Sequence, residues 1–262
     1  MIRHQINGVV YYTFSILDNF PELVHAVTTR HGGVSTGPYA SLNLSYALGD
    51  NPAAVAENVR RACKALGLRP EHLVSPNQHH TANVRRVDAG DRGRVWPGYD
   101  ALITDQVDVP LLLRYADCTP VLIYDPVHHA LAVVHSGWRG TVQGITRAAV
   151  EALCREYGSR PVDMVAAIGP SIGPCCYEVG EEVAEAVHAA FARPHELLPG
   201  RPGTRPHFDL WAANRRWLVE AGVRKIEVSE FCTACHTDEF YSHRAARGRT
   251  GHFGAVMGLV GW

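Results

Sequence analysis

The stretch VPLLLRYADCTPVLIYDPVHHALAVVHSGWRG, residues 109–140, carries the strongest fold signal in the chain. It contains three continuous apolar runs, each of strand length and each followed by residues that favour turns. The runs cover residues 109–115, 121–124 and 130–134. Apolar runs of this length are typical of strands buried on both faces. We therefore expect three central strands, with Cys118 and His135 at strand ends.

Further strands and helices alternate on both sides of this block. Strands are expected at residues 24–29, 164–168, 226–228 and 253–260. The segment 32–38, rich in glycine, is expected to be a loop after the first of them. The stretch 193–206, rich in proline and glycine, is expected to be a loop that extends from the surface.

Four helices are indicated by apolar residues that recur at helical spacing. The expected apolar faces are Val55, Val59, Ala62 and Leu66; Val142, Ile145, Ala149 and Leu153; Val183, Val187 and Phe191; and Leu210, Ala213, Trp217 and Ala221. Asn51 and Asp209 are expected to cap the first and last, Gly67 to end the first, and the second to run from about Thr141 to Gly158. The chain is therefore of the α/β class, with more strands than a doubly wound fold requires.

Composition limits the setting of the protein. No linker or repeat divides the 262 residues, so we expect one domain over residues 1–262. The formal net charge of −1 predicts neither nucleic acid nor membrane as a partner. The N-terminus has no apolar signal core, which predicts a cytoplasmic protein. We expect a monomer or a weak homo-oligomer. Seven cysteines, an odd number, favour reduced thiols over a disulfide framework.

Histidine and cysteine next to the central strands suggest a metal centre. Cys118, His135 and one of the adjacent pair His79 and His80 would offer a thiolate and two imidazoles, which suit zinc with one coordination position open. Neighbours on an extended segment point to opposite sides, and the residues alone leave open which histidine of the pair faces the centre. The alternative for Cys118 is a buried small apolar residue.

Arg139 follows the third central strand by a short turn that contains glycine. A strand, a turn and a helix start that carries a guanidinium group form a site for an anion, and phosphate is the expected ligand.

Other cysteine motifs give weaker signals. The sequence Cys232-Thr233-Ala234-Cys235-His236 has the form of a c-type haem attachment site, which we interpret as accidental because the chain lacks an export signal. A redox dithiol is the alternative. Neighbouring cysteines cannot form a relaxed disulfide, so we interpret Cys175-Cys176 as part of the packing or of a loop.

Taken together, the motifs resemble the YfiH/LACC1 family, a laccase-domain family first described as multicopper polyphenol oxidase-like. The resemblance covers almost the whole chain. It rests on TRHGGVS 29–35, SLNL 41–44, QHH 78–80, ADCTP 116–120, HSGWRG 135–140, GPSIGPCCYEV 169–179, CT 232–233 and FYSHR 240–244.

This resemblance implies a fold and a ligand set. The fold is a single-domain layered α/β/β/α sandwich with mixed sheets, CNF1/YfiH-like. The metal is a catalytic zinc, with copper as the alternative, bound by His80, Cys118 and His135. The family's Gln-x-His motif selects His80 over His79. This chain departs from the usual Gln-Val-His-Gly, because His79 and Thr81 replace the valine and the glycine.

The resemblance also implies an activity. It indicates a purine nucleoside phosphorylase that acts on adenosine, inosine, guanosine and methylthioadenosine with phosphate, and that also deaminates adenosine. The alternatives are a peptidoglycan-editing hydrolase acting on muropeptide precursors and a laccase-like polyphenol oxidase. Cys118, His135 and Arg139 are the expected catalytic residues.

Substrate binding is assigned to Arg30, Asn43, Ser242 and Arg244, although a turn-forming role is the alternative for Asn43. Two other classes of protein stay open. A thiol hydrolase would use Cys118 as nucleophile and His135 as base. A non-catalytic protein would hold zinc in a closed site with a fourth protein ligand.

Overall fold

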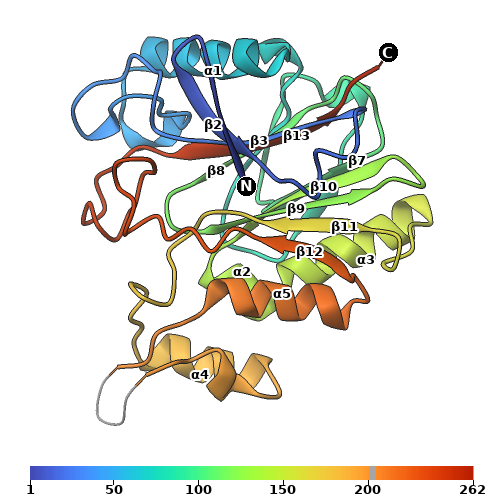
Figure 1. Cartoon of the computed structure of the whole chain (residues 1–262), viewed down its shortest axis with the longest axis vertical. Helices are drawn as coiled ribbons and strands as arrows, with labels where there is room; N and C mark the ends of the chain where they lie inside the picture. Colours follow the sequence, from blue (N-terminus) through green and yellow to red (C-terminus); the bar gives the residue numbers. More distant parts are fainter. Residues whose placement is uncertain (201–204, 262) are drawn as a thin grey trace.

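Two β-sheets lie face to face in the computed structural model, which describes residues 1–200 and 205–261 (Figure 1). The first sheet is antiparallel, in the order β1 (Ile2–Ile6), β2 (Val9–Thr13), β3 (Leu23–Thr28), β13 (Phe253–Leu259) and β8 (Leu111–Tyr115). The second is mixed, in the order β12 (Lys225–Val228), β11 (Val165–Ile168), β9 (Thr119–Asp125), β10 (Ala130–Ser136), β7 (Ala101–Thr104) and β5 (Val84–Arg86). A small parallel pair joins β4 (Ser75–Asn77) to β6 (Val95–Pro97).

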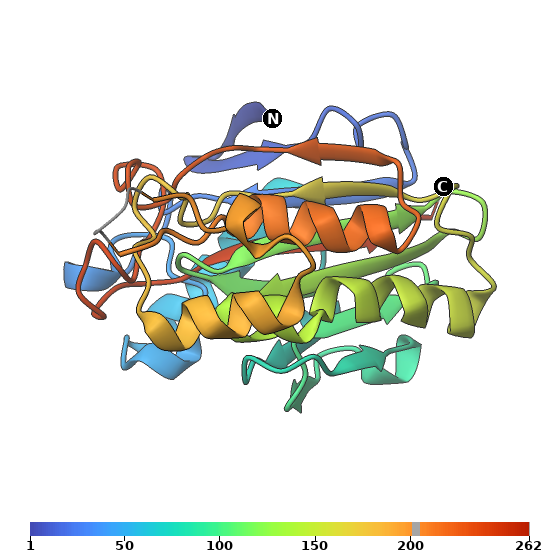
Figure 2. The same cartoon turned by 90° about the horizontal axis from the view of Figure 1, so that it is seen from below.

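Helices cover the outer faces of both sheets (Figures 1 and 2). Helix α1 (Pro52–Leu66) packs on the first sheet, and α3 (Ile145–Tyr157) and α5 (Leu210–Glu220) pack on the second. The short α2 (Trp138–Gln143) precedes α3, and α4 (Glu181–Ala190) lies beside α2. The layers are therefore α/β/β/α, and the expected fold class is confirmed.

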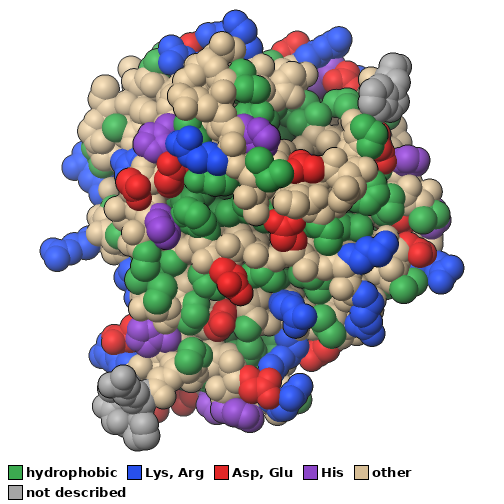
Figure 3. Space-filling view, viewed as in Figure 1, with side chains coloured by type: hydrophobic (Ala, Val, Ile, Leu, Met, Phe, Trp, Pro, Cys, Tyr) green, Lys and Arg blue, Asp and Glu red, His purple; other side chains and the backbone are tan. Residues whose placement is uncertain are grey.

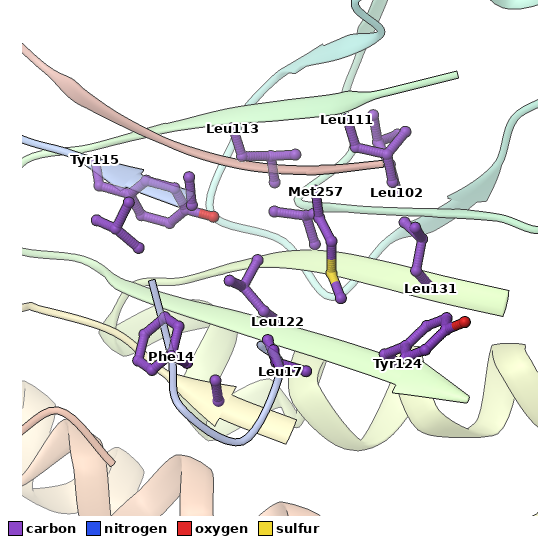
Figure 4. Close-up of a cluster of buried hydrophobic side chains, with 14 of the residues drawn as sticks. Phe14, Leu17, Leu102, Leu111, Leu113, Tyr115, Leu122, Tyr124, Leu131 and Met257 are labelled. Carbon is purple, nitrogen blue, oxygen red and sulfur yellow. The ribbon is translucent and has the colours of Figure 1, made fainter. Parts of the chain in front are cut away.

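The main hydrophobic core fills the space between the two sheets (Figure 4). Leu111, Leu113 and Met257 of the first sheet face Leu122 and Leu131 of the second, and all five are fully buried. Each such side chain contributes about 1.5–3 kcal/mol when removed from water. Because helices cover the other faces, every residue of β9, β10 and β13 is buried, which explains the continuous apolar runs in the sequence.

The expected central strands are confirmed, and their boundaries differ by at most two residues. Strand β8 begins at Leu111 rather than at residue 109, because Pro110 has no N–H to donate to a ladder. Helix α1 begins and ends as expected: the Asn51 side chain accepts from Ala53 N–H, and Gly67 adopts φ 69°. Phe191 and Ala221 are the residues that follow α4 and α5.

The helix expected from Thr141 to Gly158 is wrong in its start and its continuity. The chain enters α2 at Trp138, and Gly144, at φ 79° and ψ 32°, separates α2 from α3. The left-handed conformation of Gly144 satisfies the last carbonyls of α2 and turns the chain into a new helix. Gly158 ends α3 as expected.

The N-terminal hairpin β1–β2 was missed. Its turn is Asn7-Gly8, with φ 52° and 84°, which is the pair most typical of a two-residue hairpin. Strand β1 is short and largely exposed, so it shows little apolar periodicity. Within the stretch 193–206 expected to be a loop, Pro194–Glu196 form a short 3-10 turn, and residues 201–204 lie outside the described residues.

The surface in Figure 3 intersperses acidic and basic side chains, in keeping with the formal net charge of −1. Among the described residues, the helices are too short or too polar to span a bilayer.

Candidate metal centre and active site

Three side chains that are far apart in the sequence converge where the two sheets meet. His80 lies in the loop after β4, Cys118 in the turn that leads from β8 into β9, and His135 near the end of β10. One potential ligand atom from each lies within 4.8 Å of the others. In the described part of the chain, no fourth histidine, cysteine or carboxylate joins this group. The arrangement offers a thiolate and two imidazoles with room for another ligand.

The loop that carries His80 is folded around the buried carboxylate of Asp100. Asp100 Oδ1 accepts the N–H of His80 at 3.0 Å, and Oδ2 accepts those of His79 and Thr81 at 3.1 and 2.7 Å. His80 adopts φ 59°, a left-handed conformation that turns the chain sharply. As a result His80, and not His79, joins Cys118 and His135.

Asp100 also orients His135. Burial would raise the pKa of Asp100, but hydrogen bonds from His135 and Thr81 lower it to about 2, so the group is a carboxylate and can only accept. His135 therefore donates through Nδ1, at 2.8 Å, so Nε2 is the nitrogen that a metal would bind, in place of the proton that it carries in the imidazolium form. A carboxylate that fixes the ring of a ligating histidine in this way is usual at zinc sites.

Sequence reasoning missed Asp100. The available signal was an acidic residue immediately before the apolar run 101–104, which is β7 and was also missed.

The cysteine is held as a thiolate by its neighbours. Burial would raise the pKa of Cys118, but His135 and His80 lower it to about 6. Burial likewise opposes the protonation of His135, whereas Cys118 and Asp100 raise its pKa to about 9. Thiolate is the form of cysteine that binds metals.

The backbone of Gly137 leaves the space that a metal centre requires. A Cβ at this position would lie 2.9 Å from both Cys118 Sγ and His80 Nδ1. Gly137 has φ −74° and ψ 173°, which any residue adopts, so its lack of a side chain is needed for space and not for conformation. The donor set and this space both fit a zinc ion.

A cavity of about 670 Å³ opens onto these three residues. Its size falls in the range of pockets that enclose small ligands. Trp138, Tyr46 and Tyr177 contribute aromatic side chains to its lining, and Arg114, Arg139 and Arg244 contribute guanidinium groups.

The three arginines differ in how their charge is balanced. Arg139 lies in the first turn of α2, half exposed, 3.7 Å from Glu182 and over the ring of Trp138. Arg244 donates to the carbonyls of Cys176 and Glu178 at 3.2 and 3.1 Å. These carbonyls hold the side chain without cancelling its charge.

Arg114, which sequence reasoning missed, donates to the carbonyl of Leu44. Burial lowers its pKa to about 10, so it is still protonated at neutral pH. No motif marked it, because it lies inside the apolar run that forms β8. Since α2 has only six residues, the positive charge at this cavity comes from the arginine side chains and little from a helix dipole.

Asp117, next to Cys118, positions the segment that carries Arg244. Its backbone has φ 81°, and its carboxylate accepts the hydroxyl of Thr233 and the N–H of Arg244, each at 2.6 Å. The residue thus couples the turn that holds Cys118 to the C-terminal segment of the cavity wall.

Three residues expected to bind substrate lie outside the cavity lining. Arg30 donates to the carbonyls of Ala40 and Thr237. Asn43 is fully buried, and its side chain bonds to Ser45 and His252, as the turn-forming alternative requires.

Ser242 is buried, and its hydroxyl accepts Ala245 N–H. Its neighbour His243 lines the cavity instead, together with His252.

Comparisons with known proteins agree with one another on the family of the chain. The family model described as multi-copper polyphenol oxidoreductase laccase matches residues 24–260. A protein of Geobacillus stearothermophilus named purine nucleoside phosphorylase YlmD is 39% identical over 250 residues, which cover 91% of each chain. One of Deinococcus radiodurans, named purine nucleoside phosphorylase, is 43% identical over 235 residues, 90% of this chain and 88% of its own.

Among solved structures, the Bacillus licheniformis hypothetical protein YfiH has a TM-score of 0.91 at 31% identity, with 97% of both chains covered.

Proposed function

The chain belongs to the multi-copper polyphenol oxidoreductase laccase family, and from this membership we propose that it is a zinc-dependent purine nucleoside phosphorylase. The observation that carries the proposal is the His80, Cys118 and His135 group in the lining of a cavity that also includes three arginines. The names of the relatives from Geobacillus stearothermophilus and Deinococcus radiodurans support the same activity.

Residues 1–262 would form one catalytic domain, acting in the cytoplasm as a monomer or a weak homo-oligomer. Its substrates would be adenosine, inosine, guanosine or methylthioadenosine together with phosphate. The products would be the free base and ribose 1-phosphate, or its methylthio derivative.

The lining of the cavity supports the proposal of two substrates. A purine would contact the aromatic side chains of Trp138 and Tyr177, and phosphate would be bound by Arg139, Arg244 and Arg114. Positive charge near the anomeric carbon would orient the phosphate and balance the charge that develops on the leaving base.

His80, Cys118 and His135 would hold the zinc, which supplies Lewis-acid chemistry when bound. Asp100 keeps the proton of His135 on Nδ1 and fixes the loop of His80. Asp117 holds the backbone of Arg244 beside the cavity.

Phosphorolysis is tested with purified protein, adenosine and phosphate. Adenine and ribose 1-phosphate should form only when phosphate is present. Cys118→Ala and His135→Ala should each abolish turnover, whereas Cys154→Ala, at a half-buried cysteine outside the cavity, should leave it unchanged. Unchanged turnover in either of the first two variants would remove the metal centre from the mechanism.

The role of Arg139 is tested by the phosphate dependence. Arg139→Ala should raise the KM for phosphate about tenfold or more, since a charged hydrogen bond contributes about 1.5–3 kcal/mol. Zinc content should not change. Arg160→Ala is the matched control, because Arg160 is an exposed arginine in the segment after α3 and does not line the cavity.

We propose adenosine deamination as a second activity of the same site. Adenosine and water would give inosine and ammonia, and phosphate would not be required. Ammonia release without phosphate, lost in Cys118→Ala, is the expected result; its absence restricts the enzyme to phosphorolysis.

Rival activities have distinct outcomes in the same assays. A thiol hydrolase is favoured by the lowered pKa of Cys118 beside His135, and would cleave muropeptide precursors with no phosphate dependence. A laccase-like oxidase would contain copper rather than zinc and would oxidise phenols.

A further inference from the structure

Four cysteines that take no part in the cavity lie together beside it. Cys175 and Cys176 belong to the loop after β11, and Cys232 and Cys235 belong to the segment after β12. All four sulfur atoms lie within 4.8 Å of one another. Residues nearly 60 positions apart in the sequence therefore meet at one point.

The sulfur distances suit a single metal ion. Cys176 Sγ lies 3.4 Å and Cys175 Sγ 3.6 Å from Cys235 Sγ. A disulfide would require about 2.05 Å. Four sulfurs at about 2.3 Å from a tetrahedral zinc are separated by about 3.8 Å, close to the distances here.

The local backbone is also of the kind that holds a thiolate. Cys232 and Cys235 form a Cys-x-x-Cys turn in which Cys235 N–H and His236 N–H donate to the Cys232 carbonyl. Gly173 N–H donates to Cys232 Sγ at 3.2 Å, which stabilises negative charge on that sulfur. A Cβ on Gly173 would lie 3.2 Å from Cys232 Cβ and 2.5 Å from the ring of Trp211, so the close approach of the two segments depends on this glycine.

We propose that Cys175, Cys176, Cys232 and Cys235 bind a zinc ion in a closed tetrathiolate site, separate from the His80 centre. The two sites share no residue, and the proposal does not rest on the proposed function. Four thiolate ligands leave no open position, which is typical of a structural zinc. A redox dithiol, the alternative interpretation of these cysteines, needs only two thiols, whereas four converge here.

A zinc ion bound by the four cysteines would stabilise one wall of the cavity at the His80 centre. Tyr177 and Ile172, on either side of the cysteine pair, line the cavity, and the carbonyl of Cys176 accepts a hydrogen bond from Arg244. The other segment carries Thr233, which bonds to Asp117 next to Cys118. An ion bound between the two cysteine-bearing segments would fix their relative position and thereby keep these contacts formed.

Zinc content of the full-length protein tests the proposal. Cys235→Ser should contain one equivalent of zinc less per chain than the wild type, measured by elemental mass spectrometry after purification under reducing conditions. Cys154→Ser is the control, since Cys154 lies outside the cluster, and its zinc content should equal that of the wild type. Because Cys235 is exposed, its replacement should leave the core intact.

Two further measurements separate this site from the His80 centre. Cobalt-substituted protein should show strong thiolate-to-cobalt absorption that Cys235→Ser removes and Cys118→Ser largely retains. Cys235→His should restore the missing equivalent, because histidine can replace one cysteine in such sites. Equal zinc content in wild type and Cys235→Ser, or a disulfide within the cluster mapped in freshly purified protein, would overturn the proposal.

Discussion

At the scale of single residues, one buried carboxylate organises the metal centre. Asp100 accepts the N–H groups of His79, His80 and Thr81 and the ring proton of His135. An amide in its place would present an N–H to at least one of these donors. Such a mismatch leaves a buried polar group without a partner.

Asp100→Asn should therefore weaken zinc binding by about 10- to 100-fold, the usual effect of losing the partner of a ligating histidine. Competition with a chelator of known affinity measures the change. Thr81→Val, which removes only the hydroxyl bonded to Asp100 Oδ2, is the milder control. An Asp100→Asn protein with wild-type affinity would show that orientation of His135 does not depend on this contact.

Gly137→Ala should prevent zinc from binding at the His80 centre without unfolding the chain. The new methyl group would lie 2.9 Å from both Cys118 Sγ and His80 Nδ1, while zinc–ligand distances tolerate shifts of only about 0.2 Å. Gly180→Ala is a matched control, because Gly180 also precedes a helix, with φ −83° and ψ 178°, and has open space around it. In both variants, zinc content measures binding at the centre and the far-UV circular dichroism spectrum measures folding.

The sequence predicted the candidate ligands and did not predict what holds them. Cys118 and His135 stand at the ends of apolar runs, where side chains are accessible to a cavity. His80 was separated from His79 only by the family motif, because the turn at φ 59° that selects it depends on Asp100. Arg114 was hidden for a similar reason: its role is set by which side of β8 faces the cavity.

At the scale of elements, the break between α2 and α3 depends on one backbone conformation. Gly144 has φ 79°, and a Cβ there would meet nothing closer than 3.7 Å. Space is therefore available, and only the left-handed conformation restricts the residue.

Gly144→Ala should lower the free energy of unfolding by about 1–2 kcal/mol, the cost of left-handed backbone for a residue with a Cβ. Gly144→Asn should recover part of this loss, because asparagine tolerates that conformation better. Urea unfolding curves measure both. Equal stability of the two variants would mean that the segment adopts another backbone path at no cost.

The elements that the sequence predicted well are those buried on both faces or capped by side chains. Strands β9 and β10 and helix α1 belong to this group. Short edge strands such as β1 and β5 bury few side chains, so their sequences carry little periodicity and their pairing is set by the rest of the sheet.

At the scale of the whole molecule, stability should depend on pH through His25 in the first sheet. Its Nε2 accepts Phe14 N–H at 2.8 Å, and burial lowers its pKa to about 4, although Asp18 and Glu227 oppose this effect. The folded protein keeps His25 neutral, whereas the unfolded chain protonates it at about pH 6.5.

The unfolded state thus binds the extra proton between about pH 6.5 and 4, and stability falls as the pH drops through this window. At pH 5 the loss from this group should be about 2 kcal/mol relative to pH 7. His25→Gln, which keeps an acceptor for Phe14 but does not titrate, should show a shallower fall. Chemical denaturation at a series of pH values compares the two; parallel curves would exclude His25 as the source.

The position of β13 between β3 and β8 has a consequence for biosynthesis. Residues 253–259 pair with strands at 23–28 and 111–115, so neither neighbour can complete its ladder until β13 has been synthesised. At about 5–20 residues per second, the ribosome needs about 7–30 s to travel the 144 residues from position 115 to 259. During that interval the nascent polypeptide presents open, apolar strand edges, so it should depend on chaperones and remain sensitive to protease until β13 has left the ribosome. Ribosome complexes stalled before and after residue 259 would reveal the difference.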